Sequence, residues 1–269
     1  MSNWSLPEVR MHYESDVPVG ELLADISDPD QIIGPTLDQF HIGGATATAR
    51  LLDLLELPDA SHVLDVGSGL GGPARLLATT RDWQVTGVDL APEFCRIASA
   101  LSARAELSAQ TTFCAGDALH LPFANGLFDA VWTEHVAMNI GARDDFYREL
   151  ARVVRPGGLL AIYDVVVVEN TSPLTFPVPW ARKAEHSHMV TAKMLRERVT
   201  YAGWNAYIWN DESIFARDWL TNMRLAKGPA GPSLHHIMGD DFSLMTRNLR
   251  DNFVDGRLGA IQAVFEKPA

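Results

Sequence analysis

The sequence has little cysteine: Cys95 and Cys114 are the two in a chain of 269 residues. Neither belongs to a CxxC pair. Structural disulfides persist in oxidising compartments, whereas cytosolic thiols stay reduced. We therefore expect both residues to be free thiols in a cytoplasmic protein.

Basic clusters are also absent. The formal net charge is −12, and no stretch gathers lysine and arginine. Nucleic-acid phosphates and anionic membrane surfaces are both bound by basic patches. The composition therefore argues against nucleic acid and membrane as partners and favours a small-molecule substrate.

No long apolar run occurs. The longest apolar stretch, "GGLLAIYDVVVVEN", is far shorter than the ~20 residues of a membrane helix and contains Asp164. The N-terminus lacks the basic flank and apolar core of a secretory signal. Internal repeats and low-complexity tracts are missing as well. We expect no membrane span and a single large domain with a cap.

Short apolar runs alternate with segments of helical periodicity. The predicted strands are "SHVLDVG", "QVTGVDL", "TTFCAGDA", "FDAVWTE", "LLAIYDVVVV" and, at the end of the chain, "GRLGAIQAVFEKP". The predicted helices between them are "GGATATARLLDLLEL", "GGPARLLATTR", "APEFCRIASALSARAEL" and "DDFYRELARVVRPGG", the last ended by Pro156 and Gly157. Strands that are apolar on both faces indicate a doubly wound α/β fold, with a mainly parallel sheet covered by helices.

The order of these segments divides one domain into four parts. Residues 1–44 are predicted to form an N-terminal lid segment with short helices, and residues 45–168 the ligand-binding core. Residues 169–255 begin with a stretch rich in proline and aromatics and continue with three predicted helices, "TAKMLRERVTYAGW", "DESIFARDWLTNMRL" and "DDFSLMTRNLRDNF". We expect this part to form a helical cap on the substrate side. Residues 256–269 give the final strand.

The stretch "VLDVGSGLGGPA", residues 63–74, fits two glycine spacings. Gly67, Gly69 and Gly72 have the spacing of a dinucleotide-binding turn, which holds a pyrophosphate at a helix N-terminus. Asp65 precedes these glycines at the end of the strand. A carboxylate there repels a pyrophosphate and attracts an ammonium or sulfonium. Gly72 is then expected to be only a helix-start residue.

Two further acids end the next two predicted strands. Asp89 stands about 20 residues beyond the glycines, where an acid accepts hydrogen bonds from ribose hydroxyls. Asp117 is placed to accept from the exocyclic amine of adenine. With Asp65, they suit a nucleoside that carries a cationic side chain, which is S-adenosylmethionine. The alternatives are an NAD-dependent oxidoreductase, for which no Tyr-x-x-x-Lys motif is present, and a non-catalytic nucleotide-binding protein of the same fold.

The ordered motifs "VLDVGSGLGGPARLLA", "VTGVDLAP", "GDALHLPF", "FDAVWTEHVAMNI" and "RVVRPGGLLAIYDVV" resemble those of class I S-adenosylmethionine-dependent methyltransferases. "LDQFHIGG", "FPVPWA" and "GRLGAIQ" resemble the small-molecule branch, with its sarcosine/dimethylglycine N-methyltransferase-like proteins and its sugar and polyketide O-methyltransferases. The resemblance implies a seven-stranded Rossmann-like sheet with an antiparallel last strand. It also implies methyl transfer to a nitrogen or oxygen of a small molecule, with S-adenosylhomocysteine as the product.

The resemblance also implies a set of cofactor-binding residues. Asp65, Gly67, Ser68 and Gly69 would line the methionine end, which Gln39 and His41 also reach. Asp89 and Leu90 would hold the ribose, Asp117 and Ala118 would flank the adenine, and Glu134 would face the cofactor.

A general base is useful only for a hydroxyl acceptor, because an amine needs only to arrive unprotonated. His135 follows the fourth strand and Asp164 lies in the fifth, so neighbouring strand ends can form a histidine base oriented by a carboxylate. Some sugar O-methyltransferases of the branch resembled use such a pair. The alternative is a structural histidine and an ordinary strand aspartate.

The acceptor itself is not identified by the sequence. Met138, Tyr163, Trp180 and His186 are candidate substrate contacts, with core packing as the alternative for the aromatic residues. His186 and His188 lack the further ligands that zinc needs, so no metal is expected. The sequence leaves the oligomeric state open, a homo-oligomer included.

Overall fold

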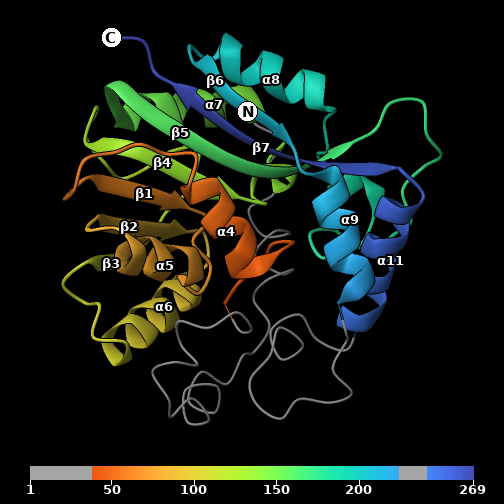
Figure 1. Cartoon of the computed structure of the whole chain (residues 1–269), viewed down its shortest axis with the longest axis horizontal. Coiled ribbons are helices and arrows are strands. Elements are labelled where there is room, and N and C mark those ends of the chain that lie inside the picture. Colours follow the sequence, from red (N-terminus) through yellow and green to blue (C-terminus); the bar gives the residue numbers. More distant parts are fainter. Residues whose placement is uncertain (1–37, 224–240) are drawn as a thin grey trace.

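The computed structural model of the chain describes residues 38–223 and 241–269 (Figure 1). The predicted N-terminal helices lie outside the described residues. Seven strands form one sheet: β1 (His62–Val66), β2 (Gln84–Asp89), β3 (Thr111–Ala115), β4 (Phe128–Glu134), β5 (Val154–Val167), β6 (Asn205–Asp211) and β7 (Leu258–Glu266). Their order in the sheet is β3-β2-β1-β4-β5-β7-β6.

Strands β1 to β5 pair in parallel, and β7 runs antiparallel between β5 and β6. The predicted doubly wound sheet with an antiparallel last strand is confirmed. Its central strands are apolar on both faces because helices cover both: in β1, Val63 packs into one buried cluster and Leu64 into the other. Each such buried side chain stabilises the fold by about 1.5–3 kcal/mol.

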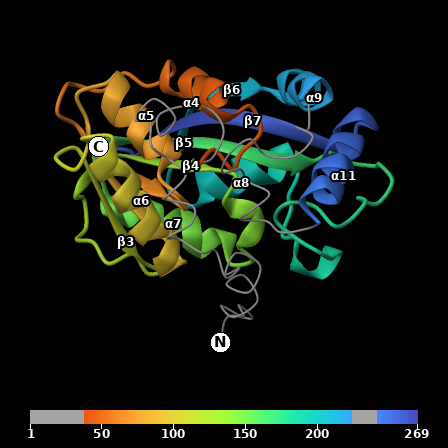
Figure 2. The same cartoon turned by 90° about the horizontal axis from the view of Figure 1, so that it is seen from below.

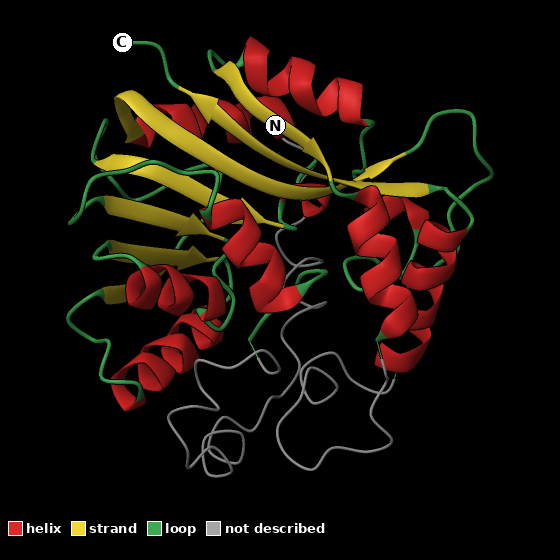
Figure 3. Cartoon of the chain, in the orientation of Figure 1, coloured by secondary structure: helices red, strands yellow, loops and turns green. Residues whose placement is uncertain are grey.

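Helices lie on both sides of the sheet (Figure 3). They are α4 (Gly44–Leu52), α5 (Gly72–Thr80), α6 (Pro92–Arg104), α7 (Arg143–Val153), α8 (Ala192–Tyr201), α9 (Ser213–Asn222) and α11 (Phe242–Val254). Figure 2 shows α9 and α11 side by side at one end of the sheet, away from α5 and α6. We call these two helices the cap. Among the described residues, no helix is long and apolar enough to cross a membrane.

Helix α7 ends earlier than the sequence predicted. It stops at Val153, and Pro156 and Gly157 already belong to β5. Proline has no N–H to donate to the carbonyl four residues before it. That carbonyl, of Arg152, instead accepts the N–H of Gly126 at 2.9 Å.

The segment expected to be only a cap also completes the sheet. Helix α8 buries Leu195 and Val199 against the sheet core, and β6 forms an edge of the sheet. Strand β6 was missed because an edge strand needs no continuous apolar run. Its Tyr207 is 64% exposed.

Candidate active site

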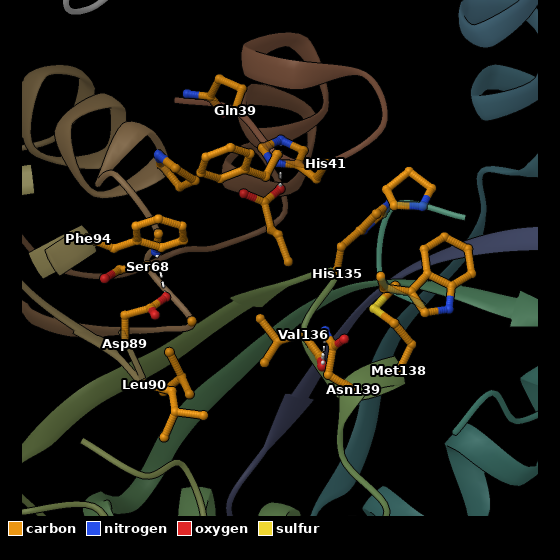
Figure 4. A pocket seen from close by; sticks show the side chains of 18 of the residues that line it. Gln39, His41, Ser68, Asp89, Leu90, Phe94, His135, Val136, Met138 and Asn139 are labelled. Carbon is orange, nitrogen blue, oxygen red and sulfur yellow. Dashed lines mark hydrogen bonds and ion pairs between the residues drawn. The ribbon is translucent and has the colours of Figure 1, made fainter. Parts of the chain in front are cut away.

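One pocket opens where β1, β2 and β4 end, between the sheet and the cap. Figure 4 shows side chains from these strand ends and from the segment before α4 facing a common space. All the residues predicted to contact a cofactor line it: Gln39, His41, Asp65, Gly67, Ser68, Gly69, Asp89, Leu90, Asp117, Ala118 and Glu134. Parallel strands bring their carboxyl ends to one edge of the sheet, which is why residues from four loops meet here.

The glycine loop is bound tightly to β2. The N–H groups of Gly67 and Ser68 both donate to the Val88 carbonyl, at 2.8 and 3.1 Å. Gly67 has φ +76°, in the left-handed region that favours glycine. A Cβ at Gly67 would lie 2.3 Å from Cγ2 of Val136. The loop therefore needs glycine there for both backbone conformation and space.

Replacing Gly67 with alanine is expected to lower the free energy of unfolding by about 2–4 kcal/mol, from left-handed strain and overpacking. Chemical denaturation measures this loss. Adding Val136→Ala should recover only part of the stability, since it removes the clash and leaves the φ penalty. An unchanged midpoint in the single variant would contradict this account of the loop.

Gly72 is the first residue of α5, as predicted. A Cβ there would lie 2.4 Å from the Asp38 carbonyl oxygen. The buried Asp38 carboxylate also pairs with Arg75 of α5. Gly72 therefore lets the segment that carries Gln39 and His41 pack on the start of α5.

Two buried carboxylates face the pocket with an oxygen that makes no hydrogen bond. These atoms are Oδ2 of Asp65 and Oε1 of Glu134, and the latter lies 3.6 Å from Nε2 of His41. Burial raises the pKa of Asp65 well above its usual range, and the nearby carboxylates of Glu134 and Asp89 raise it further. Such a site favours a bound cation and disfavours a pyrophosphate.

The other oxygen of Glu134 is held by helix α4. Thr48 donates its hydroxyl to Glu134 Oε2 at 2.9 Å. His41 Nε2 lies 3.0 Å from the Gly44 carbonyl and 3.0 Å from the Thr48 hydroxyl. Because a carbonyl only accepts, Nε2 carries the proton. This network fixes the residues before α4 over the strand ends.

Asp89 and Asp117 are bound by backbone N–H groups and keep capacity for a ligand. Asp89 accepts from Gly69 and Ala91, at 2.9 Å each. Asp117 accepts from Leu119 at 2.9 Å. A carboxylate has about four lone-pair sites, so each retains free acceptor positions.

His135 lies at the border between the strand ends and the cap. Its φ of 56° turns the chain out of β4. Nδ1 lies 3.1 Å from the Tyr163 carbonyl, so Nδ1 donates, and Nε2 accepts from the Ile42 N–H at 3.4 Å. Burial lowers the pKa of His135 to about 3, and His41 lowers it as well. The ring is therefore neutral, and the lone pair on Nε2 is directed at the Ile42 N–H through a long hydrogen bond.

The predicted pairing of His135 with Asp164 is wrong. The Tyr163 carbonyl is the partner of Nδ1, and Asp164 does not line the pocket. Adjacent residues of a strand point to opposite faces. Tyr163 of β5 faces His135, whereas Asp164 is buried on the other face near Arg143 and Tyr147, where burial raises its pKa to about 7.

Of the predicted substrate contacts, Met138 and Trp180 line the pocket, whereas Tyr163 and His186 do not. Tyr163 is completely buried below His135, with ring centroids 4.5 Å apart. His186 ends the short 3-10 turn Ala184–His186 with its side chain exposed, beside Glu185. Tyr163 is therefore a core residue and His186 a surface residue, and neither is a substrate contact in this pocket.

Several lining residues were missed by sequence reasoning. They are Phe40, Phe94, Val136, Trp219, Leu220, Met223, Phe242 and Leu249. The helical spacing of Ala216 and Leu220 reveals that α9 has a buried face. Periodicity does not show which surface that face covers, so it could not identify these residues as lining the pocket.

Comparison with known proteins supports the domain type. Residues 64–162 match the family model described as a methyltransferase domain. The chain is 27% identical over 224 residues to the 27-O-demethylrifamycin SV methyltransferase of Amycolatopsis mediterranei, covering 82% of each chain. It is 36% identical over 132 residues to the methyltransferase GfsG of Streptomyces halstedii, an alignment that spans 49% of this chain and 48% of that relative.

Solved structures share the fold over nearly the whole chain. The [4+2]-cyclase SpnF superposes with a TM-score of 0.73 at 23% identity, covering 98% of this chain and 96% of that one. Phosphoethanolamine N-methyltransferase 2 of Haemonchus contortus, in complex with S-adenosylmethionine, gives 0.75 at 18% identity, covering 99% of this chain and 60% of that one. These structures confirm the predicted Rossmann-like fold, and the family model supports a methyltransferase domain over residues 64–162.

Proposed function

We propose that this chain, whose residues 64–162 form a methyltransferase domain, transfers a methyl group from S-adenosylmethionine to an oxygen or nitrogen of a small molecule. The observation that carries the proposal is the row of acids at the strand ends, with buried oxygens of Asp65 and Glu134 left without a hydrogen bond.

The residues present fit this cofactor better than NAD. The carboxylates of Asp65 and Glu134 would attract the ammonium and sulfonium charges, whereas they would repel a pyrophosphate. Asp89 would accept from the ribose hydroxyls, with Leu90 beside it, and Asp117 and Ala118 would flank the adenine. Gln39, His41 and the loop of Gly67, Ser68 and Gly69 would enclose the methionine end.

When bound, S-adenosylmethionine supplies a methyl group activated by the positive sulfur. The chain aligns the acceptor with that methyl and excludes water, and both effects accelerate an in-line displacement. For a hydroxyl acceptor, Nε2 of His135 exchanges its long hydrogen bond from the Ile42 N–H for the acceptor hydroxyl and takes the proton, while the Tyr163 carbonyl holds the ring. An amine acceptor needs no base if it arrives neutral.

Titration calorimetry with S-adenosylmethionine, S-adenosylhomocysteine and NAD tests the cofactor. We expect binding of the first two and none of NAD; binding of NAD alone would contradict the proposal. A screen of hydroxyl and amine acceptors, with products detected by mass, tests the transfer itself.

Cofactor affinity should fall as pH falls. The pKa of Asp65 is raised in the free site, and a bound ammonium lowers it again. Binding therefore releases a proton in the pH range between these two values, and the attraction is lost once Asp65 is protonated in the free protein. The dissociation constant measured from pH 8 down to pH 4 should rise, and Asp65→Asn should flatten the dependence. A flat wild-type profile would contradict this role of Asp65.

A further inference from the structure

The pocket has two halves of different chemistry. The half at the strand ends contains the carboxylates, and the half under the cap has an apolar wall. We propose that the cap half binds an uncharged, mainly hydrocarbon acceptor whose hydroxyl reaches His135, and not an amino acid, a cation or a phosphorylated compound. This inference rests on the proposed function and names the substrate class.

The apolar wall comes from four separate parts of the chain. Its main members are Met138, Trp180, Trp219, Leu220, Met223 and Leu249. All of these except Met223 belong to or pack against one buried cluster on the sheet. Trp180 and Leu249 are each 6% exposed, and Leu220 is 3% exposed. Most of the wall is part of the core, so Trp180, Leu220 and Leu249 cannot turn aside to admit water.

Two polar side-chain groups in the cap half already donate to protein partners. Trp180 Nε1 donates to Ser187 Oγ at 2.9 Å. The hydroxyl of Thr246 donates to the Phe242 carbonyl at 2.8 Å, within its own helix. Within residues 38–223 and 241–269, no lysine or arginine lines the pocket, and each acidic lining residue lies in the segment before α4 or at a strand end.

These observations decide the charge of the acceptor. A charged group that enters the cap half loses its hydration and finds no opposite charge among the described residues that line it. Apolar surface gains by entering the same space. The rings of Trp180 and Trp219 offer a cation only cation–π attraction. The site therefore selects an uncharged acceptor with a large apolar body.

The experiment compares para-hexylphenol with two analogues whose alkyl chain ends in an ammonium or a carboxylate. Each is titrated into full-length protein saturated with S-adenosylhomocysteine, and binding is measured by calorimetry. The neutral phenol should bind at least about tenfold more tightly than either charged analogue. Equal or tighter binding of the ammonium or the carboxylate analogue would overturn the proposal, as would failure of all three to bind.

A variant locates the binding. Trp219→Glu should weaken the binding of para-hexylphenol by at least about tenfold, because it places a charge in the apolar wall. The matched control is Tyr201→Glu, since Tyr201 is 75% exposed on α8 and does not line the pocket. Trp219→Phe keeps the wall apolar and should retain binding. A loss of binding seen only in Trp219→Glu is then due to the added charge and not to the loss of the indole ring. Unchanged binding in Trp219→Glu would overturn the assignment.

The cofactor titration keeps the two proposals distinguishable. If S-adenosylhomocysteine binds and the neutral phenol is not preferred, the substrate class is wrong and the proposed function stands. If S-adenosylhomocysteine does not bind, the proposed function is contradicted. The three phenols are then titrated without it, and their order still tests the cap half.

Discussion

Replacing Asp89 with alanine is expected to weaken S-adenosylmethionine binding by about 100-fold or more. The proposed ribose contacts are hydrogen bonds to a charged group, each contributing about 1.5–3 kcal/mol. The same substitution removes the acceptor of the Gly69 N–H, so the glycine loop loses one of its hydrogen bonds to β2. Calorimetric titration of the cofactor measures the loss.

Asp129→Ala is the matched control. Asp129 also accepts one backbone N–H, from His62 at 2.7 Å, and it pairs with Arg155, but it does not line the pocket. The Asp129→Ala variant should lose some stability and keep the cofactor affinity of the unchanged protein. Unchanged affinity in Asp89→Ala, with a normal melting transition, would refute the assignment of Asp89 to the ribose.

Removing the imidazole of His135 is expected to reduce kcat for a hydroxyl acceptor by about 10²–10⁴, the usual contribution of a general base. His135→Asn is the better variant because asparagine tolerates the left-handed φ of 56°, whereas alanine adds backbone strain. Cofactor affinity should stay unchanged, and kcat for amine acceptors should fall far less than kcat for hydroxyl acceptors. Steady-state kinetics and calorimetry on the same preparations separate these effects.

His62→Ala is the control for His135, since His62 hydrogen-bonds Thr86 on β2, outside the pocket. Because the pKa of His135 is lowered to about 3, its ring is neutral from pH 5 to 8. With both substrates saturating, kcat should show no rise near the ordinary histidine pKa of about 6.5. Such a rise, or wild-type turnover in His135→Asn, would contradict the base role.

The cofactor half of the site was predictable because its rule is local. Each of Asp65, Asp89 and Asp117 ends or follows a short apolar run, and parallel strands bring such ends to one edge. The resemblance implied seven strands, as found, but the position of the seventh was less predictable. Strand β6 lies at the edge of the sheet and lacks the apolar run that marks a buried strand.

The pairing of His135 with Asp164 failed because it depended on register between two strands. Glu134 is opposite Tyr163, so the residue after Tyr163 points to the opposite face of the sheet. A shift of one residue exchanges the two faces. Register is set by packing along the whole strand, and no local motif reports it.

The sequence by itself determined the parallel strands of the sheet, the glycine loop and the row of acids, because short-range periodicity and strand-end chemistry specify them. The tertiary structure decided that a carbonyl orients His135, that Tyr163 and His186 stay out of the pocket, and that Trp219 enters its wall. The physical reason is that these facts depend on strand register and on which helix face packs against which surface, and both are fixed by contacts between residues far apart in the chain.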